Sequence, residues 1–244
     1  MAGVEWTLEA VVKRLQEIRA KGYIGVPPDM HRTDDGIVGQ ILEREFTVGE
    51  NNISLRDLGT FELKGIRATS TNITLSHKKA QKGCSPIDIF NRFGYIRASN
   101  RDPNVLKKKL FVTVNGRKPN PQGLILRSID DVSVAMFYGD EELCEWDLTG
   151  PLHKMDQIIL GIATTTGKTN ALDETFHYNK AFLLDGMKPL KALIDDGCIV
   201  IEMSIDQPIL ADGTPLKAPH DRGPHIRTAV AKLPRVYKVM KQLI

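Results

Sequence analysis

The segment Asp57–Lys64 places acidic and basic side chains at the start of a short predicted strand. Alternate side chains of a strand share a face, so Phe61 and Leu63 point to one side and Glu62 and Lys64 to the other. The segment therefore predicts a strand with an apolar face and a face that carries a carboxylate and an amine.

The turn at Gly59 is expected to bring Asp57 beside Glu62 and Lys64. Carboxylates bind a hard cation such as Mg²⁺. A lysine at this spacing orients or activates a water, or stabilises charge on phosphorus. The group suits metal-assisted phosphodiester hydrolysis. The same spacing also arises by chance in a highly charged chain, and a solvated Glu–Lys pair is the simpler interpretation of these residues taken alone.

The distribution of charge indicates what the partner is. Net charge is only +3, but residues 56–118 hold fourteen basic and four acidic residues. From residue 217 onwards there are seven basic residues and one acid, whereas residues 130–147 hold seven acids and no base. This pattern favours a surface directed at a polyanion, with the acidic segment turned away. The alternative is that the charges scatter over all faces after folding.

Length and apolar content limit the class of protein. A chain of 244 residues can bury a core as one large domain or as two lobes. No apolar run approaches the roughly 20 residues that span a bilayer, so no membrane association is expected. The acids within Met1–Ala20 exclude a signal peptide. Three widely spaced cysteines argue against a disulfide framework or a zinc ribbon, and they suit a reducing, cytoplasmic location.

The periodicity of apolar residues predicts alternating helices and strands. Helices are expected at 7–20, at 36–46 with Asp34 or Asp35 as cap, at 187–194 and from Pro234 to the end. Strands are expected at 73–75, 110–114, 157–165 and 198–205, with a meander over 124–126, 132–138 and 143–148. Asn115-Gly116 is a hairpin turn signal. The mixture predicts an α/β or α+β domain.

Two further segments resemble known ligand-binding motifs, a phosphate-binding loop and a zinc site. Gly167-Lys168-Thr169 follows a predicted strand, as in a phosphate-binding loop. Five residues separate Gly161 from Gly167, however, where that motif needs four, so the segment is interpreted as an ordinary loop. The spacing of His220 and His225 in a Pro/Gly segment does not support a zinc site. Asp221 and Arg222 between them add groups that pair with cytosine N4 and with guanine O6 and N7. This segment is either a polar surface loop or a reader of G·C pairs.

Several blocks together resemble the BcnI/MvaI family of type II restriction endonucleases, in the MutH-like branch of the PD-(D/E)XK nucleases. They cover most of the chain in the same order: Arg32–Gly36, Gly39–Arg44, Glu50–Ile53, Phe61–Gly65, His77–Lys79, Ile89–Tyr95, Lys107–Phe111 and Pro219–His225. The chain departs from the family pattern at Arg67–Thr71 and Ala211–Ala218. The resemblance implies one nuclease domain over 1–244, with a central mixed β-sheet flanked by helices. A catalytic lobe mainly from the N-terminal half and a recognition lobe mainly from the C-terminal half would surround a DNA cleft.

The resemblance also implies roles for individual residues. Asp57, Glu62 and Lys64 would form the catalytic set, with Asp57 and Glu62 holding Mg²⁺ and Glu43 as an accessory carboxylate. Mn²⁺ or Ca²⁺ would substitute in binding. The residues expected to contact double-stranded DNA are His77, Lys78, Lys79, Asn91, Arg92, Lys107, Lys108, Lys109, His220, Asp221, Arg222, His225 and Arg227.

Within the DNA-contacting set, His77 and His225 match the two histidines with which BcnI-like members read the central base pair, and MvaI-like members differ at the second position. The expected site is 5′-CC/SGG. The family implies a monomer that nicks the two strands in sequence, and a cognate DNA methyltransferase in the host. The alternatives are a MutH-like nicking repair endonuclease, which would need an activating partner, and a DNA-binding module without catalysis.

Overall fold

The structure is a computed structural model that describes residues 6–46, 56–99, 102 and 104–244. Its contacts divide the chain into two compact units. The first unit comprises residues 1–73, 153–187 and 230–244, and the second comprises 74–152 and 188–229. Each unit is therefore assembled from segments that are distant in sequence. None of the helices in the described part of the chain is long and apolar enough to cross a membrane.

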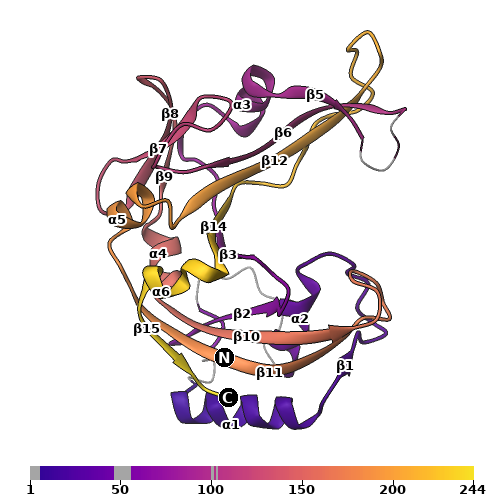
Figure 1. Ribbon diagram of the computed structural model, residues 1–244, viewed down its shortest axis with the longest axis vertical. Helices are drawn as coiled ribbons and strands as arrows, with labels where there is room; N and C mark the ends of the chain where they lie inside the picture. Colours follow the sequence, from indigo (N-terminus) through magenta and orange to yellow (C-terminus); the bar gives the residue numbers. More distant parts are fainter. Residues whose placement is uncertain (1–5, 47–55, 100–101, 103) are drawn as a thin grey trace. The chain divides into compact units, whose positions relative to one another are not determined.

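The first unit is built on a mixed sheet with strand order β1 (Ile24–Gly25), β11 (Thr175–Met187), β10 (Gln157–Thr166) and β2 (Glu62–Arg67). A further strand, β15 (Tyr237–Gln242), pairs with β11. The β2 and β10 strands run parallel, and the other pairs are antiparallel. Figure 1 shows β2, β10 and β11 side by side in this unit.

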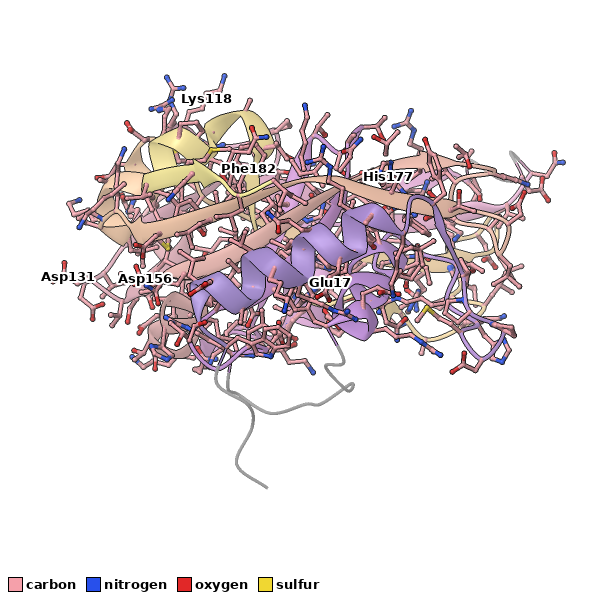
Figure 2. The ribbon with its side chains drawn as sticks, turned by 90° about the horizontal axis from the view of Figure 1, so that it is seen from below. Glu17, Lys118, Asp131, Asp156, His177 and Phe182 are labelled. Atoms are coloured by element: carbon pink, nitrogen blue, oxygen red, sulfur yellow. The ribbon has the colours of Figure 1, made fainter. Side chains whose placement is uncertain are left out.

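Two helices, α1 (Leu8–Ala20) and α2 (Ile37–Glu45), share one apolar core with this sheet. Leu63, Ile159 and Leu183 contribute to that core from three neighbouring strands, and they lie opposite one another in register. The face of β2 that carries Leu63 is thus the buried one, as expected. Figure 2 shows α1, marked by Glu17, beside the strand β11, which carries His177 and Phe182.

The second unit contains two sheets. The larger has the order β3 (Asn72–His77), β14 (His225–Ala229), β12 (Val200–Ile209), β6 (Leu106–Val114) and β5 (Tyr95–Ala98), with β13 (His220–Asp221) paired to β12. The smaller has the order β4 (Lys82–Gly83), β9 (Glu141–Asp147), β8 (Ser133–Tyr138) and β7 (Leu124–Ser128). The helices are α3 (Pro86–Phe93) and α5 (Leu190–Asp195), and α4 (Thr149–Met155) spans the boundary between the units. In the first unit, a 3₁₀ turn (Val230–Lys232) and α6 (Leu233–Val236) precede β15.

Most predicted elements are confirmed, and α1 shows why. Thr7 caps the helix by accepting a hydrogen bond from the Ala10 amide, and Val11, Leu15 and Ile18 form its buried stripe. The predicted meander over residues 124–148 is the sheet of β7, β8 and β9. The predicted buried strands at 157–165 and 198–205 correspond to β10 and β12.

Two predictions of secondary structure are wrong, the hairpin at Asn115-Gly116 and the C-terminal helix. Asn115-Gly116 closes no hairpin, because β6 pairs with β5 and β12, whereas β7 belongs to the other sheet. Gly116 instead allows a close approach, since a Cβ there would lie 2.5 Å from the Ile194 carbonyl oxygen. The predicted C-terminal helix ends at Val236 and gives way to β15, where Met240 is exposed.

The segment Pro219–Arg227 is not a free loop, because its two ends form β13 and β14 on β12. The predicted cap of the second helix also differs. Gly36 is the N-cap of α2, and Asp34 accepts a hydrogen bond from its amide. The block Glu50–Ile53 lies outside the described residues.

Candidate active site and nucleic-acid interface

The charged face of β2 carries a tight acid–amine pair. Lys64 Nζ lies 2.6 Å from Glu62 Oε1, and the Glu62 side chain is only 7% exposed. The other oxygen, Glu62 Oε2, is buried and accepts no hydrogen bond. Buried polar atoms almost always have a partner, so an unpaired carboxylate oxygen beside a lysine marks a site built for something else to bind.

Asp57 is tied to the same strand through the backbone. Its Oδ2 accepts a hydrogen bond of 3.0 Å from the Leu63 amide, which lies between Glu62 and Lys64 in sequence. Gly59 has a φ of 74°, in the left-handed region that favours glycine, and it supports the turn that returns the chain to β2. The predicted turn is confirmed, and it brings Asp57 to the start of the strand.

A second amine reaches this cluster from a distant segment. Lys154 Nζ, from the end of α4, lies 3.8 Å from Glu62 Oε2. This contact is an ion pair without hydrogen-bond geometry, since Glu62 Oε2 has no hydrogen-bond partner. Lys154 is not predictable from the sequence, because nothing in its local pattern links residue 154 to β2.

The carboxylates of this cluster fit a hard cation. Asp57 and Glu62 supply oxygen ligands, and Mg²⁺ in proteins is held by one or two carboxylates with its remaining positions filled by water and substrate oxygens. Glu62 Oε2, which is buried without a hydrogen bond, is the oxygen ligand that such an ion would use. Among the described residues, no group of three or more His, Cys, Asp or Glu side chains forms a metal cage. The structure therefore does not gather Glu43 into one cluster with Asp57 and Glu62.

Glu43 is carried by α2, which packs closely against β2 and β10 at Gly65 and Gly161. A Cβ at Gly65 would lie 2.8 Å from the Val38 carbonyl oxygen and 3.0 Å from the Gly39 Cα. On the neighbouring strand, a Cβ at Gly161 would lie 2.6 Å from a methyl group of Leu42. The glycine at Gly65 permits this close approach of helix to strand, so it sets the distance between α2 and β2.

The end of β2 is held by a buried ion-pair network that the sequence analysis also missed. Arg67 donates to both carboxylate oxygens of Glu174, at 2.7 and 2.8 Å. The side chains are 6% and 1% exposed. Arg67 also donates to Asp35 and Asn170. The hydrogen bond from Arg67 lowers the pKa of Glu174 despite its burial. The network links β2 to the start of α2 and to the segment that follows β10.

In the second unit, the larger sheet has one polar face. Residues paired across strands lie on the same face of a sheet. Glu202 pairs with His225 on β14 and with Thr113 on β6, and Asp206 pairs with His220 and Lys109. The alternate residues Ile201, Met203 and Ile205 are buried. The predicted base-contacting residues His220 and His225 thus share a face with Lys109 and Thr113 of β6.

The two histidines predicted to read the central base pair are in contact. The rings of His77 and His225 meet edge to face, with centroids 4.4 Å apart. His225 Nδ1 is buried and has no hydrogen-bond partner. Burial lowers the pKa of His225, and Arg227 acts in the same direction. A neutral imidazole offers one donor and one acceptor, which suits a base edge.

Each acid on the polar face is paired with cations. Asp206 accepts hydrogen bonds from Lys107 at 3.2 Å and from Arg222 at 2.9 Å. Burial raises the pKa of Asp206, but those two hydrogen bonds outweigh burial and leave it below its usual value. Arg227 donates to both oxygens of Glu202 at 2.9 Å. Sequence reasoning did not single out either acid, because they lie on a strand that reads as plain core.

The remaining residues that are predicted to contact DNA differ in whether their side chains are exposed or already hydrogen-bonded within the protein. Lys108 donates to the Asn91 carbonyl oxygen, and Lys109 is buried and donates to Ala98. Lys79 is exposed, and Trp146 holds the Lys78 carbonyl oxygen. Asp221 accepts from the Gly223 amide.

The acidic segment 130–147 is not separate from the basic residues in space. Glu141 binds both terminal nitrogens of Arg92 at 2.6 Å, and Glu145 binds Lys82. Part of the positive charge of residues 56–118 is therefore neutralised within the second unit. The sign pattern along the chain overstates the charge available to a polyanion.

Comparisons with known proteins give consistent matches. The MvaI/BcnI restriction endonuclease family model matches residues 12–237. The structure is similar to one of restriction endonuclease MvaI in a complex with its cognate DNA substrate, with a TM-score of 0.73, 19% sequence identity and coverage of 97% of this chain and 98% of the other. For MvaI in the absence of DNA the TM-score is 0.51, with 17% identity and full coverage of both chains. No curated protein sequence matches the chain significantly.

Proposed function

Because the chain belongs to the MvaI/BcnI restriction endonuclease family and is thus a type II site-specific deoxyribonuclease, we propose that Asp57, Glu62 and Lys64 are its catalytic centre. The observation that carries this assignment is that Glu62 Oε2 is buried without a hydrogen bond, while Lys64 binds the other oxygen of the same carboxylate. The fold is proposed to be that of the MutH-like PD-(D/E)XK nucleases, with the split into a catalytic and a recognition lobe that the sequence predicts.

The roles follow from how each group is held. Asp57 and Glu62 would bind Mg²⁺, which supplies Lewis-acid activation of a phosphodiester oxygen and of water when bound. Asp57 is oriented for this by the Leu63 amide, which donates to its Oδ2. Lys64, held by Glu62 Oε1, places an ammonium group where it positions the attacking water and stabilises negative charge. Glu43 stays a proposed accessory carboxylate.

Sequence choice is assigned to the larger sheet of the second unit. His77 and His225 would read a central G·C or C·G pair, and Asp221 and Arg222 the outer G·C pairs, which gives 5′-CC/SGG. The contact between the two histidines and the lowered pKa of His225 support this assignment. Lys78, Lys79, Arg92 and Lys107 would hold phosphates, a contribution that is independent of sequence and sensitive to salt.

We further propose a monomer with one catalytic centre that nicks the two strands in turn, in the cytoplasm, beside a methyltransferase that protects host DNA. The similarity to a structure of MvaI with DNA supports double-stranded DNA as the partner. The test is to digest a plasmid of known sequence with the purified protein and Mg²⁺, and to map the ends. Cuts within 5′-CCSGG, with nicked circles preceding linear DNA, are expected. Cuts elsewhere refute the proposed site, and intact DNA refutes the proposed activity.

A further inference from the structure

Asp206 is a buried carboxylate that binds two cations on the polar face of the larger sheet. Its side chain is 9% exposed, whereas those of Lys107 and Arg222 are 26% and 40% exposed. Each carboxylate oxygen serves one cation, Oδ1 for Lys107 and Oδ2 for Arg222. The group as a whole keeps one positive charge, and it presents that charge through the more exposed partners.

Three contacts fix Arg222, and they come from different directions. Its amide donates to the Ser204 carbonyl oxygen at 3.1 Å, which holds its backbone against β12. Its guanidinium lies over the Phe111 ring, 5.6 Å from the centroid. The Asp206 hydrogen bond uses only the Nη2 end of the guanidinium. The geometry leaves donors on the planar fork for an acceptor outside the protein.

A contribution to stability alone accounts poorly for this arrangement. Buried ion pairs are weak evidence for stability, because desolvation offsets much of the attraction. Here one carboxylate is shared by two cations, so without Asp206 the ammonium and the guanidinium would repel each other. Since a free arginine side chain has many rotamers, holding it in one of them reduces the entropy lost on binding.

We propose that Asp206 is a positioning residue for base recognition, which holds Arg222 in the orientation that binds the edge of one outer guanine. This inference rests on the proposed function, and it adds a residue that does not itself touch DNA. The Phe111 ring packs against the guanidinium, and Asp206 holds it by a hydrogen bond. Lys107 keeps the carboxylate charged, and it leaves Arg222 as the group that reads the base.

The test uses the full chain and its mapped plasmid site. Duplexes with each base pair of the site replaced in turn are cleaved by the parent and by Asp206→Asn, and kcat/KM is measured for each duplex. A bidentate arginine–guanine contact contributes enough discrimination that its loss is expected to lower the preference for one outer G·C pair by about tenfold. Preference at the central pair should be unchanged. Asp195→Asn, which breaks the exposed Lys191–Asp195 pair, is the matched control.

Two further variants separate positioning from general stability. In an Arg222→Ala background, Asp206→Asn should cause no additional loss at the same base pair, because the group that it positions is absent. Phe111→Leu removes a 44% exposed ring, so it should fold and should weaken the preference for that same pair. This second variant keeps the test decisive if Asp206→Asn folds poorly.

The possible outcomes are distinct. Suppose that the parent cuts specifically, and that Asp206→Asn and Phe111→Leu either leave the preference at every base pair unchanged or lower it equally at all base pairs. In that case this inference fails while the proposed function stands. If the parent does not cut DNA, the proposed function fails and this inference falls with it. Loss confined to one outer pair, shared with Arg222→Ala, supports it.

Discussion

Lys64 Nζ lies 2.6 Å from Glu62 Oε1 on the side of β2 opposite Leu63, which is buried in the core. The strand thus packs its apolar residues on one side and holds a largely buried acid–amine pair on the other. Because Lys64 uses only one carboxylate oxygen, Glu62 Oε2 stays buried without a hydrogen bond. An unpaired buried acceptor is unfavourable for folding alone, which is why we assign it a ligand-binding role.

Replacing Glu174 by Gln is expected to destabilise the protein strongly. It breaks a bidentate contact and leaves Arg67 with only partial compensation in a buried site. Breaking a buried pair by removing one partner costs about 3–5 kcal/mol. Urea unfolding at neutral pH measures this loss. Glu141→Gln removes an equally bidentate but exposed contact with Arg92, and it should leave the free energy of unfolding nearly unchanged.

The effect of Glu174→Gln should depend on pH. Arg67 lowers the pKa of Glu174 in the folded protein, so the unfolded chain binds the proton more readily. The stabilisation is therefore complete above the unfolded pKa of about 4.3, and it is lost as pH falls through the folded pKa. Parent and variant should differ most at neutral pH and converge in acid. A difference that is constant with pH would contradict the assigned ion pair.

Replacing Gly65 by Ala is expected to lift α2 from β2. The added Cβ would lie 2.8 Å from a backbone oxygen, and backbone cannot move as a side chain can. We expect a loss of about 1–3 kcal/mol, typical of overpacking, and slower cleavage because Lys64 is adjacent. Gly161→Ala meets side chains, a methyl group of Leu42 at 2.6 Å and the Tyr178 ring at 3.5 Å, so it should cost less. Gly150→Ala meets nothing within 4 Å and is the control. Equal losses of stability in all three variants would show that the close packing of α2 on these glycines is not required.

Replacing His225 by Ala is expected to relax the choice of the central base pair. The imidazole packs against His77, and its low pKa keeps it neutral at neutral pH, with one donor and one acceptor. Cleavage of duplexes that carry C·G or A·T at the centre measures the preference, which should fall by about tenfold for the loss of a good base contact. A preserved preference for the parent's central pair would show that the histidine does not read it.

The sequence predicted those parts of the fold that depend on local patterns. The amphipathic α1, the alternation along β2 and the turn at Gly59 each follow from residues close together in the chain. The strand β11 was not predicted, because its polar residues Asn179 and Lys180 interrupt the apolar run at the bulge opposite β10. The C-terminal strand was predicted as a helix, since Val236 and Met240 have helical spacing and only pairing with β11 selects the strand.

The candidate site was predictable in its sequence motifs but not in its supporting contacts. Asp57, Glu62 and Lys64 lie within one segment, so their spacing alone indicated them. Lys154 and Asp206 reach their partners only through the tertiary fold. The same limit applies to charge, because the pairing of Arg92 with Glu141 joins a basic segment to an acidic one.

The most direct test of the account compares cleavage and binding by the parent and by Glu62→Gln and Lys64→Ala. With Mg²⁺, the account predicts that both variants lose cleavage of the mapped site by at least about a thousandfold, the scale expected for removing electrostatic stabilisation at the reacting phosphate. With Ca²⁺ and no turnover, Lys64→Ala should still bind the same duplex specifically. Cleavage by either variant at the parent's rate would contradict the central claim.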